Sequence, residues 1–233
     1  MPRSPAGTSW RTIALISSAL ALVALVQLMP DSRFVTEAGE HLVLGMLAPL
    51  LIVAAQPGQL VGAAVGPRRL HRWSRTPYAR VATAPMLVAV GFAVTPWLLW
   101  LTPLRAVLSN TGPVHLLVHV HLFVVGLLFV EHLAGRAPLP TRLTPPMRLL
   151  IGAVVLVSHG FLGLVLTSLD RPVLSTDLPV AAGIADQRAG AQVMWVGGEF
   201  VMVGLLAATM WEWMRREERS TPRHTTGARA DGE

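Results

Sequence analysis

The sequence predicts an all-α, polytopic membrane helix bundle with about six transmembrane helices and both termini in the cytoplasm. Of its 233 residues, 52% are hydrophobic and only 14% are charged, which is more apolar material than a soluble domain can bury. Several runs approach twenty residues without a charge, and about 20 apolar residues in a helix cross the hydrocarbon core of a bilayer. We therefore expect an integral membrane protein.

Six apolar segments are the predicted spans of one membrane domain, residues 11–214, and they cover residues 11–29, 37–55, 81–101, 113–134, 147–168 and 190–214. The first could pass for a signal peptide that follows a short cytoplasmic N-terminus, residues 1–10. Its apolar part is longer than a typical signal core and no clear cleavage site follows it, so we interpret it as a retained helix. The second has Glu40 and His41 near its start and ends before Pro57.

Proline positions and the loops between apolar segments describe the later spans. The third contains Pro85 and Pro96, so we expect a kink that neighbouring helices accommodate. The fifth follows a loop rich in proline and arginine, and a longer loop, residues 169–189, leads to the sixth. The charged tail, residues 215–233, contains Thr, Pro and Gly and is expected to be disordered.

Arginine placement predicts the orientation of the bundle. With a cytoplasmic amino terminus and six spans, only Arg33, Arg105, Arg171 and Arg188 lie outside, and the other fifteen of the nineteen arginines lie inside. Short cytoplasmic segments of membrane proteins carry such an excess of basic residues. The formal charge of +6 therefore records topology, and no nucleic-acid-binding module accompanies it.

Cysteine is absent from the chain. A disulfide framework and thiolate metal ligation are thereby excluded, as are copper chaperones that use Cys motifs. Any metal site must be built from histidine, methionine, carboxylate or backbone oxygen.

The fourth span carries four histidines, each a candidate functional residue because imidazole is costly in lipid. His115 and His119 are four residues apart, so they share one face of the helix. His121 points elsewhere, and His132 lies toward the other end, too far along the axis to share an ion with His121. We expect function at the end that carries the first three.

Depth along the helices brings residues of four spans to two neighbouring layers in the outer half of the membrane. At about 1.5 Å per residue, His41 and His119 lie roughly 6 to 9 Å in, and His121, His159 and Glu199 lie roughly 12 to 14 Å in. Neutral imidazoles with nearby thioethers suit copper, particularly Cu(I), better than Mg²⁺ or Ca²⁺. The thioethers available are those of Met46, Met194 and Met202. The simpler alternative is that these polar groups hydrogen-bond across helices and hold the bundle together.

Four sequence blocks carry a family resemblance: EHLVLGMLAPLLIVAAQPG (40–58), HLLVHVHLFVVGLLF (115–129), SHGFLGLVL (158–166) and DQRAGAQVMWVGGE (186–199). Together they resemble the multi-spanning CtaG family of bacterial cytochrome c oxidase assembly factors. The resemblance implies a multi-pass protein of the bacterial plasma membrane that helps to assemble haem–copper oxidase by supplying copper at the binuclear centre. The implied partners are the oxidase subunit that carries that centre and a copper donor protein. The family is usually drawn with one more span.

Carried over by position, the resemblance implies functional roles for His41, His115, His119, His159, Asp186, Met194 and Trp195. Spacing and depth add His121 and Glu199. The candidate metal ligands, with copper as the hypothetical ion, are therefore His41, His115, His119, His121, His159, Asp186, Met194 and Glu199.

The sequence is also compatible with two other functions. Facing histidines in a helix bundle also hold b-type haem in electron-transfer proteins. A copper or proton transporter could use His132 and the outer histidines as the two ends of a path. The sequence contains no nucleophile–base arrangement, phosphate loop or reactive carboxylate pair, so we do not expect an enzyme.

Overall fold

The computed structural model describes residues 5–28, 33–55, 74–104, 112–135, 140–174 and 177–220, with residues 66, 68 and 72 between them. Every regular element in these ranges is helical, which confirms the predicted all-α class. Five stretches are long and apolar enough to cross a membrane: Trp10–Gln27, Phe34–Ala55, Gly112–Ala134, Pro145–Ser168 and Val180–Arg219. A sixth apolar helix, Pro85–Leu101, is shorter.

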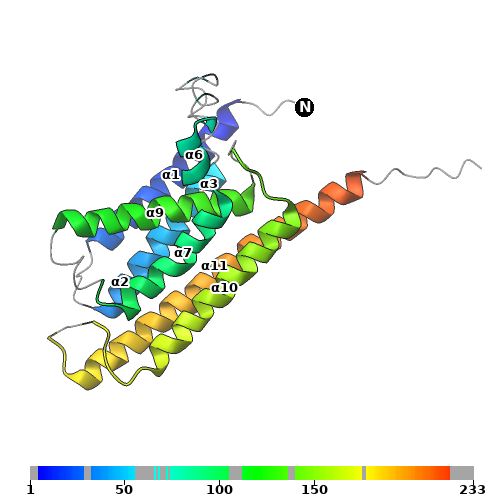
Figure 1. Ribbon diagram of the computed structural model, residues 1–233. Helices are drawn as coiled ribbons and strands as arrows, with labels where there is room; N and C mark the ends of the chain where they lie inside the picture. Colours follow the sequence, from blue (N-terminus) through cyan, green and yellow to red (C-terminus); the bar gives the residue numbers. More distant parts are fainter. Residues whose placement is uncertain are drawn as a thin grey trace, which may run out of the picture.

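The helices form two groups (Figure 1). Helices α10 (Pro145–Ser168) and α11 (Val180–Ser220) lie side by side as a long antiparallel pair. The other group contains α1, α2, η1, α3 and α7, and α9 crosses it. Their bounds are α1 Pro5–Gln27, α2 Phe34–Leu42, η1 Val43–Leu47, α3 Ala48–Ala55, α6 Pro77–Ala82, α7 Pro85–Leu101 and α9 Gly112–Ala134.

Two predicted spans have different bounds in the structure. The predicted third span, 81–101, is divided at Thr83 and Ala84 into α6 and α7. Pro85 is in the first turn of α7, where its missing N–H costs no helical bond, and Pro96 lies inside the helix. The predicted sixth span, 190–214, is part of α11, which begins ten residues earlier and continues six residues into the predicted tail. The remainder of that tail lies outside the described residues.

A π-helical turn, η1, interrupts the second span between α2 and α3. Its backbone approaches α9 so closely that a Cβ on Gly126 would lie 2.1 Å from the carbonyl oxygen of Gly45. Only glycine fits at such a crossing. π turns shift the register of the residues around them and often occur at functional sites, and η1 follows the helix that carries Glu40 and His41.

The buried apolar side chains of the described residues form two clusters. One joins η1, α3, α7, α9, α10 and α11 and includes Phe92 stacked on Phe129, with ring centres 4.4 Å apart. The other lies beside the start of α2 and includes Phe34, Trp100 and Met194. Large apolar side chains such as Leu117, Val157 and Phe200 are exposed on the outside of the bundle, as expected for lipid-facing positions.

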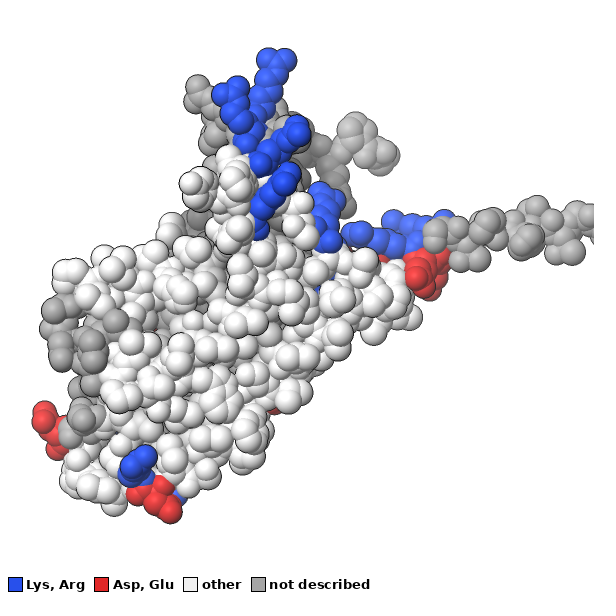
Figure 2. Space-filling model, in the orientation of Figure 1, with Lys and Arg blue, Asp and Glu red and all other residues white. Residues whose placement is uncertain are grey.

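On the face shown in Figure 2, exposed charged side chains gather at the two ends of the molecule, with a largely uncharged band between them. Exposed arginines concentrate around α6 and at the carboxyl end of α11, namely Arg68, Arg72, Arg75, Arg80, Arg215, Arg216 and Arg219. The opposite end, near the connection between α10 and α11, holds Asp170, Arg171 and Arg188. The band is the region that would lie within the hydrocarbon core of a bilayer.

Candidate metal centre

Glu40, His115 and His119 form a compact cluster, which we call the outer cluster. Glu40 lies on α2 and is buried, and the two histidines lie one turn apart on α9 with ring centres 4.2 Å apart. Each of the three offers one ligand atom, and these atoms lie within 4.8 Å of one another. The spacing of four residues places both histidines on one face of α9, as predicted from the sequence. A carboxylate from a different helix, Glu40, meets them on that face.

Hydrogen bonds orient the outer cluster. His119 Nε2 lies 3.3 Å from Glu40 Oε2, and its Nδ1 lies 3.0 Å from the side-chain nitrogen of Gln27, at the end of α1. An amide nitrogen can only donate, so Nδ1 accepts and the proton on Nε2 faces the carboxylate. To bind an ion, Nε2 must give up this proton; a ligating histidine carries its proton on the other ring nitrogen and donates it, here to the side-chain oxygen of Gln27 once that amide has turned over. Three helices thus converge on His119.

The outer cluster has the ligand types of a transition-metal site. Two imidazoles and one carboxylate suit Cu²⁺, Zn²⁺ and similar divalent ions. The carboxylate contributes a negative charge that offsets the cost of holding a cation among apolar helices. The three residues therefore fit a metal ion by donor type and by convergence.

His41 and His159 form a separate pair, which we call the inner pair. Their ring centres are 6.1 Å apart, and both side chains are buried. Both ring nitrogens of His41 and Nε2 of His159 are buried without a hydrogen-bond partner, whereas Nδ1 of His159 lies 3.2 Å from the Val155 carbonyl oxygen. Trp100 meets His41 edge-on at 5.0 Å, and Phe92 lies 5.2 Å from His159. Unsatisfied buried polar atoms are rare in folded proteins and call for an explanation.

His121 is exposed and belongs to neither group. Its Nε2 lies 3.1 Å from the hydroxyl of Thr95 on α7. Together with His41 it borders a pocket of ≈ 10 Å³, room for about one water molecule. This placement agrees with the expectation that His121 points away from the face of His115 and His119.

Glu199 and Met194 also lie apart from the outer cluster. The Trp195 indole N–H donates to Glu199, one turn further along α11. The same carboxylate packs so closely against α10 that a Cβ on Gly160 would lie 2.7 Å from it. Met194 is buried in the apolar cluster with Phe34 and Trp100. Each of these side chains has a packing role in the bundle.

Asp186 connects α11 to the start of α2. Its Oδ2 accepts a hydrogen bond of 2.6 Å from the backbone N–H of Phe34, in the first turn of α2. A carboxylate at a helix amino end satisfies a free N–H and complements the helix dipole. Asp186 therefore holds in place the helix that carries Glu40 and His41.

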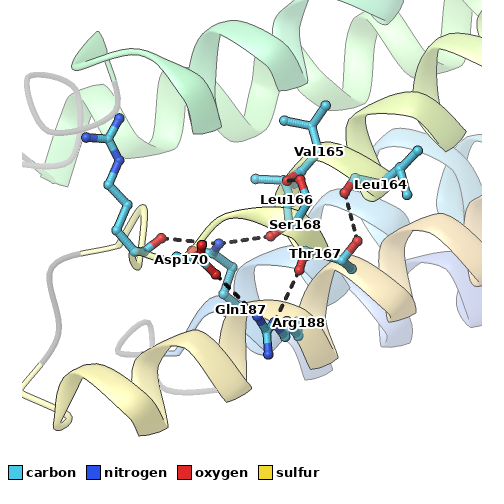
Figure 3. Close-up of polar contacts among 9 residues, drawn as sticks. Leu164, Val165, Leu166, Thr167, Ser168, Asp170, Gln187 and Arg188 are labelled. Atoms are coloured by element: carbon cyan, nitrogen blue, oxygen red, sulfur yellow. Dashed lines mark hydrogen bonds and ion pairs between the residues drawn. The ribbon is translucent and has the colours of Figure 1, made fainter.

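Gln187 fastens the neighbouring loop (Figure 3). Its side-chain nitrogen donates to the Leu166 carbonyl at 3.0 Å, and its oxygen accepts from the Val173 N–H at 2.7 Å. Arg188 donates to the Thr167 carbonyl at 3.2 Å and lies 3.8 Å from Asp170. The sequence block that begins with Asp186 and Gln187 thus holds together the end of the bundle next to the outer cluster.

Replacing Asp186 with alanine is expected to lower the free energy of unfolding by about 1–3 kcal/mol, because the buried Phe34 N–H loses its acceptor. Thermal unfolding in detergent measures the change, and Asp177→Ala, at an exposed aspartate, is the control. Binding of one divalent ion by the outer cluster should persist in both variants. An unchanged melting temperature combined with loss of the ion would instead make Asp186 a ligand.

Glu40 is the one member of the outer cluster that is missing from the sequence-derived set of ligands. It precedes His41, and an intramembrane carboxylate is itself a functional marker. Its depth is also close to that of His119, so the same reasoning that selected the histidines could have selected it.

The fold and the outer cluster define a multi-pass membrane helix bundle with a convergent carboxylate–imidazole site. The family described as cytochrome c oxidase caa3 assembly factor matches residues 3–216. The chain belongs to this family, which confirms the resemblance found in the sequence.

Three curated relatives are uncharacterized mycobacterial proteins. The chain is 28% identical to proteins of Mycobacterium bovis and Mycobacterium tuberculosis over 250 residues, and 27% identical to one of Mycobacterium leprae over 252 residues. The alignments cover 97% of this chain and 38% of each relative, so the chain spans well under half the length of these proteins. No solved structure matches.

Proposed function

We propose that this protein carries copper for the assembly of a haem–copper cytochrome c oxidase and that the outer cluster binds the copper as cargo. Family membership supports the assembly role. The observation that carries the copper role is the convergence of Glu40, His115 and His119 within 4.8 Å. Two imidazoles and a carboxylate, with no thiolate, hold copper less tightly than a cysteine site does, as delivery to another protein requires.

The proposed orientation follows from the charged ends of the molecule. The arginine-rich end, with the start of α1 and the end of α11, faces the cytoplasm of a bacterial plasma membrane. Gln27 at the end of α1, Glu40 early in α2 and His115 early in α9 all lie toward the opposite end. The outer cluster would then open toward the cell exterior, where the oxidase subunit with the binuclear centre and a copper donor could reach it.

The proposed role requires no catalysis by this chain. Glu40 would offset the charge of the ion, His115 and His119 would supply nitrogen ligands, and Gln27 would orient His119. Release requires only that a partner offer a stronger set of ligands.

The two alternative functions have weaker support. The pocket beside His41 has a volume of ≈ 10 Å³, far too small for a porphyrin. The proposed inner end of a transport path, His132, is buried with its Nε2 2.9 Å from the Thr83 carbonyl oxygen. That bond joins α9 to the junction of α6 and α7, so His132 has a role in holding these helices together.

The test of the proposed function compares oxidase from cells with and without this protein. We expect the deletion strain to assemble oxidase that lacks copper at the binuclear centre, seen by elemental analysis and by its optical spectrum. Added copper should restore it in part. Oxidase with its full copper content in the deletion strain would refute the proposed function.

A further inference from the structure

We infer that His41 and His159 form a second binding position, selective for a soft monovalent ion such as Cu(I), separate from the outer cluster. The inference rests on the proposed function in taking copper as the cargo. The bundle would then have two metal-binding positions, one that prefers a divalent ion and one that prefers a monovalent ion.

The geometry of the inner pair carries the first step. Three of its four ring nitrogens have no hydrogen-bond partner although they are buried. An ion bound linearly by two imidazoles lies about 2 Å from each nitrogen, which places the nitrogens about 4 Å apart. Ring centres 6.1 Å apart are compatible with that span. An ion bound between the rings would give one free nitrogen on each ring a partner. It would thereby remove the free-energy penalty of leaving that buried nitrogen without one.

The surroundings of the inner pair decide the charge of the ion. The rings contact each other, the indole of Trp100 and the ring of Phe92. None of these groups carries a negative charge. The cost of moving an ion into a dry interior rises with the square of its charge, so a divalent ion costs about four times as much as a monovalent one. The outer cluster has Glu40 to offset a second charge, whereas the ring partners that the structure describes around the inner pair include no carboxylate.

The two positions are joined through one helix. Glu40 and His41 are consecutive residues near the end of α2, separated from the π turn by Leu42, so their Cα atoms are about 3.8 Å apart. Glu40 faces His119 on α9, and His41 faces His159 on α10. A movement of this turn would act on both positions at once.

The experiment uses the full chain in detergent, with Zn²⁺ as the divalent probe and Ag⁺ as a redox-inert probe for Cu(I). Protein whose outer cluster is first saturated with Zn²⁺ is dialysed against Ag⁺ and analysed for both metals. We expect the native protein to retain Zn²⁺ and to bind one further equivalent of Ag⁺. His159→Phe, which keeps an aromatic ring, should lose the silver and keep the zinc. Glu40→Gln should weaken zinc binding and keep the silver.

Tryptophan fluorescence gives a second measurement, because His41 lies 5.0 Å from Trp100. Silver bound at the inner pair should quench the fluorescence of the native protein, and Trp100→Phe should remove that quenching without loss of bound silver. If His159→Phe fails to fold and loses both metals, the comparison of quenching in the native protein and in Trp100→Phe still shows whether silver binds at the inner pair.

The inference is overturned if the zinc-loaded native protein binds no silver, or if silver binding is unchanged in a folded His159→Phe variant. Zinc binding without silver binding would leave the outer cluster, and the proposed function, intact. Silver binding without zinc binding would retain the inner pair and contradict the outer cluster.

Discussion

Replacing His119 with alanine is expected to abolish measurable binding of a divalent ion at the outer cluster and to leave the oxidase short of copper. His119 is the residue on which three helices converge, through Gln27, Glu40 and its own helix α9. Loss of an outer-shell partner alone lowers metal affinity about 10- to 100-fold, so loss of a direct ligand should lower it by at least that factor. Equilibrium dialysis of purified protein and elemental analysis of the oxidase measure the two effects.

His121→Ala is the matched control for this variant. It removes the same side chain from the same helix two residues further on, but His121 is exposed and bonded to Thr95 instead of the outer cluster. We expect it to bind the divalent ion as the native protein does. Equal affinity in the two variants, or normal oxidase copper in His119→Ala cells, would show that the outer cluster does not hold the cargo.

Replacing Glu40 with glutamine is expected to weaken binding of Cu²⁺ or Zn²⁺ strongly while leaving Ag⁺ binding nearly unchanged. The substitution preserves the size of the side chain and one oxygen ligand but removes the negative charge. At 4 Å a pair of unit charges near a protein surface attracts by about 4 kcal/mol, and the attraction is larger for a divalent ion. Dialysis against each metal gives the ratio of affinities.

Glu199→Gln is the control for charge removal in another membrane-spanning helix. Glu199 accepts from the Trp195 indole on α11 and packs against Gly160, so its charge should not contribute to divalent binding at the outer cluster. If Glu199→Gln lost the ion and Glu40→Gln kept it, Glu199 would be a ligand and Glu40 would not. The set of ligands predicted from the sequence would then describe the site better than the outer cluster does.

The sequence determined the features that depend on local pattern. Long uncharged runs predicted the helical membrane class, and the structure has five long apolar helices and one shorter one. The spacing of His115 and His119 predicted a shared face, and their rings are adjacent. These predictions succeed because helical periodicity and hydropathy are properties of a single segment.

The predicted helix bounds were less accurate where tertiary packing outweighs local composition. Residues 180–189 contain charged and small residues and were expected to lie in a loop, yet they form the start of α11. This part of α11 is held against the start of α2 by the bond from Phe34 to Asp186 and by the close approach of Gly190 to Phe34. The partner that stabilises the helix is about 150 residues away in the sequence.

Only the tertiary structure decided which polar side chains meet. Depth along a helix gives the height of a residue, but not the direction in which it faces its neighbours, and the π turn after α2 changes that direction further. The structure therefore joins Glu40 to His115 and His119, pairs His41 with His159, and uses Asp186 to bond the start of α2. The rotation of each helix against its neighbours follows from long-range packing, such as the crossing of Gly126 over Gly45, and no local pattern specifies it.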